Sequence, residues 1–355
     1  MSELATILRE FGIDAGALPH GNGHINRTYL VDSTPRVILQ RINTAVFKKP
    51  EEVMENIMAV TSYLRKQILE RGGNPDKETL TFLRTRDGKP YYKTEAGDYY
   101  RAYRFVEDTV SLEAAERPED FAEAAHGFGR FQQMLADFPA DKLYETIELF
   151  HDTANRFRQL DDAIAQNASG RAADVQAEID FAMAHRHYAT MITDAIAEGS
   201  VPLRVTHNDT KLNNVLLDAK TRRACCVIDL DTVMPGSVLY DFGDALRFGA
   251  STGAEDEQDL DKIHFDLVKF EAFTAAFLSE VGTDLTAKER ELLPVSVLMM
   301  TLECGIRFLA DHINGDVYFG IHRENHNLDR ARTQLKLVYE IEQSLDAMAA
   351  IVKKY

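Results

Sequence analysis

The chain has 355 residues, 45% of them apolar, which is enough to build a sizeable core. Its 40 basic and 57 acidic residues give a formal net charge of −17, which disfavours nucleic acid and anionic membrane surfaces as partners. The three cysteines include the neighbours Cys225 and Cys226, so neither a disulfide framework nor a CxxC metal pattern can form. Because the N-terminus also lacks a signal-peptide pattern, we expect a cytoplasmic protein.

The first hundred residues predict a small β-rich unit. A short helix that Ser2 would cap precedes two β-rich runs separated by a turn. An amphipathic helix should follow from about residue 50 to 72, because Val53, Ile57, Val60, Leu64 and Ile68 have helical spacing. Three more runs, at 79–85, 91–94 and 99–108, are predicted to form antiparallel strands.

From about residue 108 the pattern changes to long helices, including 118–138 and 174–198, and helices continue to the C-terminus. A β-rich section interrupts them, with a strand at 214–217, a turn, and a second strand ending at 229–231. We therefore expect two parts, residues 1–106 and residues 107–355.

The interrupting section carries the residues best suited to chemistry. Asp209, Asn214 and Asp229 supply a carboxylate that can deprotonate a hydroxyl and two hard oxygen ligands for Mg²⁺. Such residues also serve as Asx turns and strand-end caps, which is the alternative. However, the H-x-D-x-x-x-x-N spacing followed by strand, turn and I-D favours a kinase site, with Asp209 as catalytic base and Asn214 and Asp229 as metal ligands.

The strings HNDTKLNNVLLD and VIDLDTVMPGSVLYDFGDALR resemble segments of the aminoglycoside phosphotransferase and choline kinase family, small-molecule kinases with the protein kinase fold. The resemblance implies an α+β, bilobal protein kinase-like fold, with a small antiparallel β-sheet lobe carrying one helix and a larger, mostly helical lobe. It implies ATP and Mg²⁺ as cofactors, a nucleotide-binding role for residues 1–106, and the catalytic loops and acceptor site in residues 107–355. His207 would brace the catalytic loop, and Asp241 would be structural.

An ATP site is expected at GNGHINRTYLV, residues 21–31, which occupies the place of a phosphate-covering loop. A plain hairpin turn is the alternative for so short a glycine pattern. We predict that ATP contacts the loop and, through backbone groups, the segment RFVED; the expected residues are Gly21, Asn22, Gly23, Asn26 and Val106.

Two positions depart from the kinase pattern. Asn26 replaces its third glycine, and Gln40, followed by Arg41, stands where the strand lysine belongs. Either Arg41 reaches in from the other face of the strand, or the site relies more on Mg²⁺ and backbone donors, which strand alternation favours. The helix glutamates Glu52 and Glu55 are therefore expected on a solvated face.

Further strings, among them GHINRTYLV, FHDTANRF and ECGIRFLADHINGDVYF, resemble the bacterial N-acetylhexosamine 1-kinases, which phosphorylate the anomeric hydroxyl of N-acetylglucosamine and N-acetylgalactosamine. This resemblance implies a sugar substrate. The oligomeric state stays open, with a monomer expected, and the net charge of −17 argues against nucleic acid and membrane partners. The implied sugar-binding residues are His24, Asp209, Phe248, Arg307 and Tyr318.

Alternatives remain for several of these residues. Arg307 could instead pair with Asp311 one helical turn away, Tyr318 and Phe248 could be core aromatics, and His151 could cap a helix as readily as contact substrate. The chain could also phosphorylate homoserine, choline or an aminoglycoside, or be a catalytically silent nucleotide-binding protein, which the absent strand lysine would favour.

Overall fold

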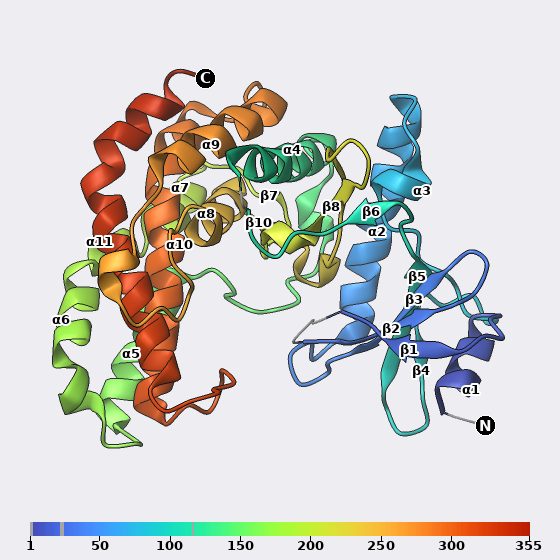
Figure 1. Cartoon of the computed structure of the whole chain (residues 1–355), viewed down its shortest axis with the longest axis horizontal. Coiled ribbons are helices and arrows are strands. Elements are labelled where there is room, and N and C mark those ends of the chain that lie inside the picture. Colours follow the sequence, from blue (N-terminus) through green and yellow to red (C-terminus); the bar gives the residue numbers. More distant parts are fainter. Residues whose placement is uncertain (1–2, 22–24, 116) are drawn as a thin grey trace.

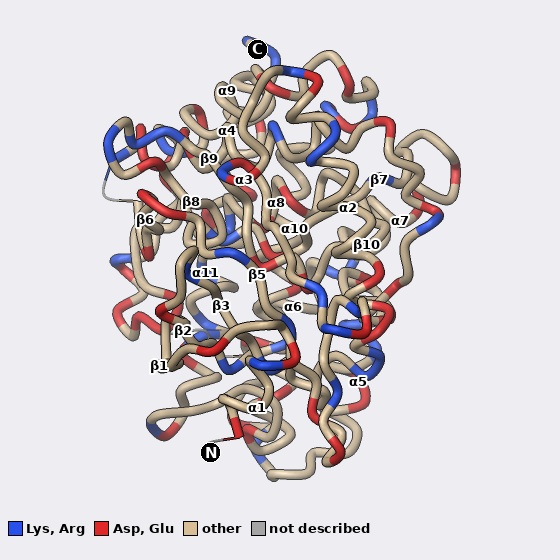
Figure 2. Tube along the Cα trace, turned by 90° about the vertical axis from the view of Figure 1, so that its right-hand side faces the viewer, with Lys and Arg blue, Asp and Glu red and all other residues tan. Residues whose placement is uncertain are grey.

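The computed structural model describes residues 3–21, 25–115 and 117–355. It shows an α+β fold in which a small antiparallel sheet lies at one end and mostly helices make up the rest, as predicted (Figure 1). The predicted cap Ser2 lies outside the described residues. Acidic and basic residues are interspersed along the chain (Figure 2), so the excess negative charge is spread over many elements.

The small sheet has five strands in the order β1-β2-β3-β5-β4: β1 (Ala17–Pro19), β2 (Arg27–Val31), β3 (Val37–Ile42), β5 (Tyr99–Arg104) and β4 (Tyr92–Lys93). All neighbours are antiparallel. Apolar residues of β2, β3 and β5 form a small core with Ile7 and Leu8 of α1 (Glu3–Glu10). The sheet therefore has its own apolar layer on the α1 side.

Helix α2 (Pro50–Glu70) connects the sheet to the main core. Proline at its first position and glutamates in its first turn suit a helix start. The five apolar residues predicted to line one face are all buried, and all five belong to the core that continues into the helical part. A short helix, α3 (Pro75–Glu78), follows.

Residues 79–85 do not form the predicted regular strand. They lie beside β5 through an isolated bridge between Phe82 and Tyr103, a bond from Leu83 N to Ala102 O of 2.8 Å and one from Arg104 N to Thr81 O of 2.9 Å. The chain then enters a turn closed by Thr85 N and Lys89 O at 2.8 Å. The turn ends the pairing before a regular strand is established.

The helical part contains α4 (Pro118–Met134), α5 (Thr153–Gln166), α6 (Gln176–Ala184), α7 (Met191–Ala197), α8 (Val238–Gly249), α9 (Leu267–Val281), α10 (Ala287–Asn314) and α11 (His326–Val352). Helix α10 packs against α5, α8 and α11. By length and composition α10 could cross a membrane, but 83% of its most apolar window is buried within the protein. Such burial is typical of a core helix.

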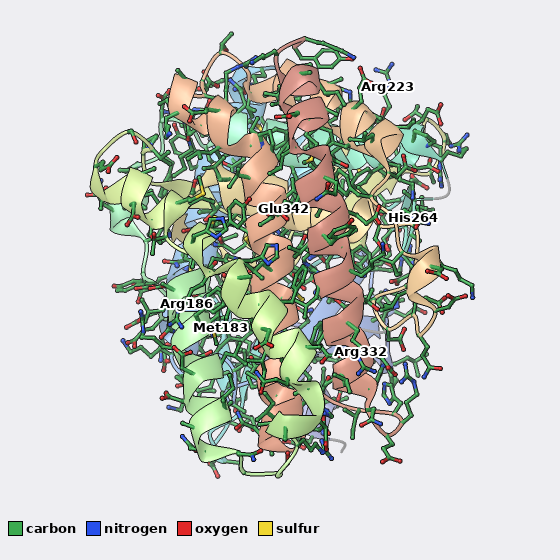
Figure 3. The ribbon with its side chains drawn as sticks, turned by 90° about the vertical axis from the view of Figure 1, so that its left-hand side faces the viewer. Met183, Arg186, Arg223, His264, Arg332 and Glu342 are labelled. Atoms are coloured by element: carbon green, nitrogen blue, oxygen red, sulfur yellow. The ribbon has the colours of Figure 1, made fainter. Side chains whose placement is uncertain are left out.

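The predicted helix at 174–198 is wrong in one respect, because it is broken into α6 and α7. His185 Nδ1 binds Phe181 O at 2.8 Å where α6 ends, and a 3₁₀ turn at Arg186–Tyr188 follows. Glu342 of α11, labelled in Figure 3, accepts a hydrogen bond from Tyr188 and contacts His185. Contacts with α11 thus hold the break, and helical periodicity does not reveal them.

The β-rich section forms two small sheets. One has the order β6-β8-β9, with β6 (Thr109–Val110), β8 (Val215–Asp218) and β9 (Ala224–Val227), and the other pairs β7 (Arg204–Thr206) with β10 (Met234–Gly236). The predicted hairpin is present, but β9 ends at Val227 rather than at 229–231. Asp229 is left-handed, with φ 59°, and Leu230–Thr232 form a 3₁₀ turn, so the strand conformation cannot continue.

Candidate active site

The candidate catalytic loop, residues 207–211, carries Asp209. It follows β7 and is held by helix α8. Asp241, which is buried, accepts hydrogen bonds from the backbone N–H groups of His207 at 2.9 Å and Asn208 at 2.7 Å. Asn208 is left-handed, with φ 64°, a conformation that asparagine tolerates better than most residues. Asp241 therefore fixes the turn immediately before Asp209.

The Asp209 carboxylate is partly exposed and has two side-chain donors. Asn214 Nδ2 lies 3.2 Å from one carboxylate oxygen and 2.8 Å from Asp209 O, and Lys211 Nζ lies 2.8 Å from the other carboxylate oxygen. Burial alone would lower the pKa of Lys211, but the charge of Asp209 raises it overall. Asp209 is thus an oriented carboxylate beside a cation, and sequence reasoning missed Lys211 although it stands two residues away.

Asp229 lies next to these residues because β8 and β9 pair side by side. Ile228 N donates to Asn214 O at 2.9 Å, which places the following residue, Asp229, at the end of the hairpin near Asn214. The Asp229 side chain is exposed at its surface, but the surrounding protein still displaces water from the carboxylate. This desolvation, and then the charges of Asp231 and Asp209, raise its pKa to about 6. The structure therefore brings together three of the predicted residues, Asp209, Asn214 and Asp229.

The donor set fits a hard divalent cation. Asn214 uses its Nδ2 on Asp209, which leaves the amide oxygen as a ligand. Carboxylate and amide oxygens are the ligands that Mg²⁺ and Ca²⁺ prefer. A bound cation would offset the charges of Asp231 and Asp209, which act together with desolvation to raise the pKa of Asp229.

His207 lies beneath the site. Its Nε2 is 2.8 Å from Ile228 O, and its ring meets those of Phe128 and Phe131 edge-on, with centroids 5.5 and 6.0 Å away. The side chain is buried, so it joins the catalytic loop to the hairpin and to α4.

On the nucleotide side, Asn22, Gly23 and His24 lie outside the described residues. Gly21 is exposed with φ 73°, a conformation that favours glycine. Asn26 accepts from Asn43 N at 3.0 Å and donates to Asp231, two residues after Asp229. Val106 is buried between β5 and β6, and its carbonyl accepts from Thr109 Oγ1 at 2.8 Å.

Gln40 stands where the kinase strand lysine belongs, and a cation approaches it from the neighbouring strand β5. Arg41 faces away from Gln40 and pairs with Asp98 at 2.5 Å, so it does not reach in. Gln40 instead binds the guanidinium of Arg101, its direct neighbour on β5, which sequence reasoning also missed. Glu52 pairs with the exposed Lys49, in keeping with a solvated face.

Among the residues expected to bind the sugar, the structure shows neither an ion pair of Arg307 with Asp311 nor a core position for Tyr318 and Phe248. Asp311 accepts hydrogen bonds from the backbone N–H groups of residues 317–319, at 2.8 to 3.0 Å, and does not pair with Arg307. Arg307 lies over the ring of Phe319, 5.4 Å from its centroid. Tyr318 is 70% exposed and Phe248 38%, so neither is a core aromatic.

His151 connects the catalytic loop to α10. It is buried, with Nδ1 2.9 Å from Glu303 and Nε2 3.2 Å from Asn208 O, whereas the residue that caps α5 is Asp152. Arg307 follows Glu303 by one helical turn. Burial, and then the positive charge of Arg307, lowers the pKa of Arg156. The two guanidinium groups therefore lie near enough for their charges to repel.

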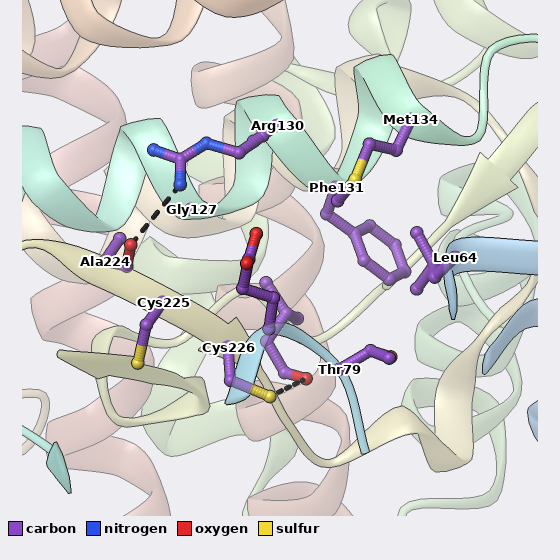
Figure 4. A pocket seen from close by; sticks show the side chains of 11 residues that line it. Leu64, Thr79, Gly127, Arg130, Phe131, Met134, Ala224, Cys225 and Cys226 are labelled. Atoms are coloured by element: carbon purple, nitrogen blue, oxygen red, sulfur yellow. Dashed lines mark hydrogen bonds between the residues drawn. The ribbon is translucent and has the colours of Figure 1, made fainter. Parts of the chain in front are cut away.

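A small pocket lies elsewhere, between α2, α3, α4 and β9 (Figure 4). Its lining includes Leu64, Phe131, Met134 and Cys226, and it includes none of the predicted site residues. The candidate site is therefore identified from the positions of its side chains and not from this pocket.

Comparison with known proteins finds a matching family model and several similar folds. Residues 16–277 match the model of the APH phosphotransferase enzyme family. The fold is similar to a microcompartment-associated aminopropanol kinase (19% identity, 98% of each chain covered, TM-score 0.67) and to a choline/ethanolamine kinase family protein from Mesorhizobium loti (14% identity, 99% and 97% covered, TM-score 0.59). It is also similar to an amicoumacin kinase solved with AMP-PNP and Ca²⁺ (12% identity, 92% and 88% covered, TM-score 0.55).

Proposed function

Since the chain belongs to the APH phosphotransferase enzyme family and is a small-molecule kinase of that type, we propose that it transfers the γ-phosphoryl group of ATP to the anomeric C1 hydroxyl of N-acetylhexosamines. The substrates would be N-acetylglucosamine and N-acetylgalactosamine, and the products ADP and the sugar 1-phosphate. The observation that carries the kinase chemistry is the convergence of Asp209, Asn214 and Asp229.

In the proposed reaction, Asp209 accepts the proton of the C1 hydroxyl while the oxygen on C1 bonds to the γ-phosphorus. The bond from the γ-phosphorus to the β,γ-bridging oxygen breaks, and ADP leaves. Lys211, 2.8 Å from Asp209, holds the carboxylate in place and adds positive charge beside the transferring group. Asn214 and Asp229 would hold Mg²⁺, which neutralises charge on the phosphates when bound.

The acceptor side supports a neutral, polar substrate. Arg156 and Arg307 have no ion-pair partner among the residues that the structure describes, whereas Glu303 is bound to His151 and Thr153. Two guanidinium groups near each other disfavour a polyamine acceptor, although the carboxylates of Glu303 and Asp152 offset part of their charge. Guanidinium N–H groups can instead donate to sugar hydroxyls and an acetamido carbonyl, and the exposed ring of Tyr318 can pack on a sugar face.

A kinase for an amino alcohol or aminoglycoside is the main rival, because an aminopropanol kinase has a similar fold. A cationic acceptor calls for unpaired carboxylates or an aromatic cage, and Asp244 near the site is already bound to Arg247 at 3.0 Å and to Thr210 N at 3.1 Å. The other rival is a catalytically silent nucleotide-binding protein.

A coupled ADP-release assay separates these proposals. It should include both N-acetylhexosamines, homoserine, choline, an aminopropanol and an aminoglycoside. We expect turnover with the N-acetylhexosamines, and phosphorus NMR should place the phosphate on C1. Preference for an amino alcohol would reject the sugar assignment, and nucleotide binding without turnover of any acceptor would support the silent protein.

Asp209→Asn tests the base. Removing a general base costs about 10²- to 10⁴-fold in kcat, and ATP binding, measured by calorimetry, should change by less than about threefold because the carboxylate acts on the acceptor. Asp218→Asn, in the same hairpin but paired with Lys77, is the control and should retain activity. Full activity of Asp209→Asn would remove the base assignment.

A further inference from the structure

The strand lysine typical of kinases is absent, but a buried cation takes its place from the neighbouring strand. Arg101 of β5 is 2% exposed and lies directly opposite Gln40 of β3. Its Nε and Nη2 donate to Gln40 Oε1 at 3.0 and 2.8 Å, and Gln40 Nε2 donates to Thr28 Oγ1 at 3.1 Å. A row of side-chain hydrogen bonds across β2, β3 and β5 therefore holds the guanidinium group in place.

The other end of Arg101 reaches residues 229–232, which follow β9 and are called the metal loop because they begin with the proposed ligand Asp229. Its Nη1 forms an ion pair with Asp231, which is 4% exposed and lies two residues after Asp229. The second carboxylate oxygen of Asp231 accepts from Asn26 Nδ2, in the segment expected to cover the ATP phosphates. One carboxylate thus joins the sheet, the phosphate-covering segment and the metal loop.

Helix α2 does not supply the carboxylate partner. Met54 faces Arg101, with its sulfur 4.0 Å from Nη1. Glu51 accepts from the hydroxyl of Tyr99, and Glu52 pairs with Lys49. The negative charge beside the buried cation therefore comes from the metal loop itself, so that the ion pair spans the two parts of the molecule.

Asp229 depends on its neighbours for its conformation. Its φ of 59° is unusual for a residue other than glycine, and such residues persist where surrounding contacts hold them. On its C-terminal side, Thr232 Oγ1 donates to His207 O at 2.6 Å, and Asp231 is bound to Arg101 and Asn26. These contacts fix the turn from which the Asp229 carboxylate projects.

We propose that Arg101 and Asp231 form a positioning pair that sets the metal-binding geometry of Asp229 and the position of Asn26 over the phosphates. The pair takes the structural place of the strand-lysine and helix-glutamate pair. This inference rests on the proposed kinase function and adds a role for residues outside its catalytic set. Both side chains are buried, so they act through Asp229 and Asn26 rather than on substrate.

The test uses Arg101→Met, Asp231→Asn and the double variant, with Arg41→Met as the matched control. Arg41 follows Gln40 on β3. It forms its own ion pair, with Asp98, on the other face of the sheet. Mn²⁺ binding in the presence of AMP-PNP, followed by electron paramagnetic resonance, and kcat for the best acceptor are measured for folded variants, as judged by circular dichroism and Tm.

Loss of a supporting contact beside a metal ligand typically costs about 10- to 100-fold in affinity or activity. We expect that loss in Mn²⁺ affinity and kcat for Arg101→Met and Asp231→Asn, a double variant no worse than the poorer single variant, and wild-type values for Arg41→Met. If Arg101→Met does not fold, Arg101→Lys, which keeps the charge but cannot donate to Gln40 and Asp231 in the same geometry, should give an intermediate loss.

Two outcomes would overturn the positioning pair. One is a folded Arg101 variant with wild-type Mn²⁺ affinity. The other is weaker AMP-PNP binding in the absence of metal with unchanged Mn²⁺ affinity, because this would make Arg101 a direct phosphate ligand. If the wild-type protein turns over no acceptor, the proposed function fails, but the binding measurements still test the pair.

Discussion

Arg307 and Arg156 bring two positive charges together at the proposed acceptor site. Neither pairs with a carboxylate among the described residues, although Arg156 donates to Phe150 O at 2.6 Å. Arg307 has no hydrogen bond of its own there and lies on the face of Phe319. Its donors are therefore available to a substrate, unlike those of Arg247, which are bound to Asp244 and Glu255.

Arg307→Ala should raise KM for the acceptor about 10- to 100-fold with a smaller change in kcat, since a charged hydrogen bond contributes about 1.5–3 kcal/mol. KM for ATP should stay near the wild-type value. Steady-state kinetics with each substrate varied separately checks this. Arg332→Ala, which removes an arginine paired with Glu178 on the face shown in Figure 3, should change neither constant. An unchanged acceptor KM would remove Arg307 from the acceptor site.

Single residues differ in how well the sequence predicts them. Asp209, Asn214 and Asp229 could be proposed together because a local motif and a hairpin fix their spacing, and the structure places them side by side. Arg101 could not be proposed from the sequence, because its role depends on which residue of β5 lies opposite Gln40. The two residues are about 60 positions apart in the sequence. The strand register, set by turns and packing, decides this. The assignments of substrate-binding residues stay predictions.

At the scale of elements, helix α8 is a support for the catalytic loop. Asp241 accepts two backbone N–H groups of that loop and also a hydrogen bond from Gln132 of α4, at 2.5 Å. Removal of the carboxylate would leave buried donors without partners, each costing about 1–3 kcal/mol. The element therefore contributes to both stability and the placement of Asp209.

Asp241→Ala should lower the free energy of unfolding by about 3 kcal/mol and reduce kcat in the fraction that remains folded. Denaturant unfolding and kinetics measure the two effects. Asp266→Ala is the control, because Asp266 also accepts two backbone N–H groups, at 2.9 and 3.1 Å, but at the start of α9 away from the loop. It should cost about 1 kcal/mol and leave kcat unchanged; equal kcat losses would contradict the role of Asp241.

The boundaries of elements were predicted less well than their existence. Helix α2 was predicted because a single apolar stripe runs along it. The sequence does not predict the break between α6 and α7, which a contact of His185 with Glu342 holds. It also does not predict the early end of β9, where Asp229 is left-handed. Neither cause changes the apolar periodicity. Local patterns therefore predict elements, and contacts between distant segments decide where they end.

At the scale of the whole molecule, the predicted α+β kinase-like fold is confirmed. The division at residues 106 and 107 stays a prediction, since β6 begins only at Thr109. The fold was predictable because the order of β-rich and helical segments is visible in the sequence. The acceptor was less predictable, because one fold can serve many acceptors; in our proposal it depends on a few side chains on α8, α10 and the loop after α10.

Acid stability of the whole chain should depend in part on Glu303. Burial alone would raise its pKa, but the charge and hydrogen bond of His151, with the charges of Arg307 and Arg156, lower it overall. A carboxyl with a lowered folded-state pKa stabilises the fold above its unfolded pKa of about 4.5, and this contribution is lost as the pH falls below that value.

The difference in free energy of unfolding between wild type and Glu303→Gln should therefore shrink as the pH is lowered from 6 to about 3. Urea unfolding at several pH values measures it. Glu342→Gln is the comparison, because the carboxylate of Glu342 is partly exposed and also contacts a histidine, His185. A difference that is constant over this range would show that the Glu303 carboxylate is not stabilised by charge.

The passage from the sheet to the helical part is short. Strand β5 ends at Arg104 and β6 begins at Thr109, so four residues separate two segments that are each fixed by pairing, β5 with β3 and β6 with β8. Four residues extend at most about 14 Å. The two parts therefore cannot drift apart, and any rotation of the sheet about this tether would also have to shift α2 within the shared core and separate Arg101 from Asp231.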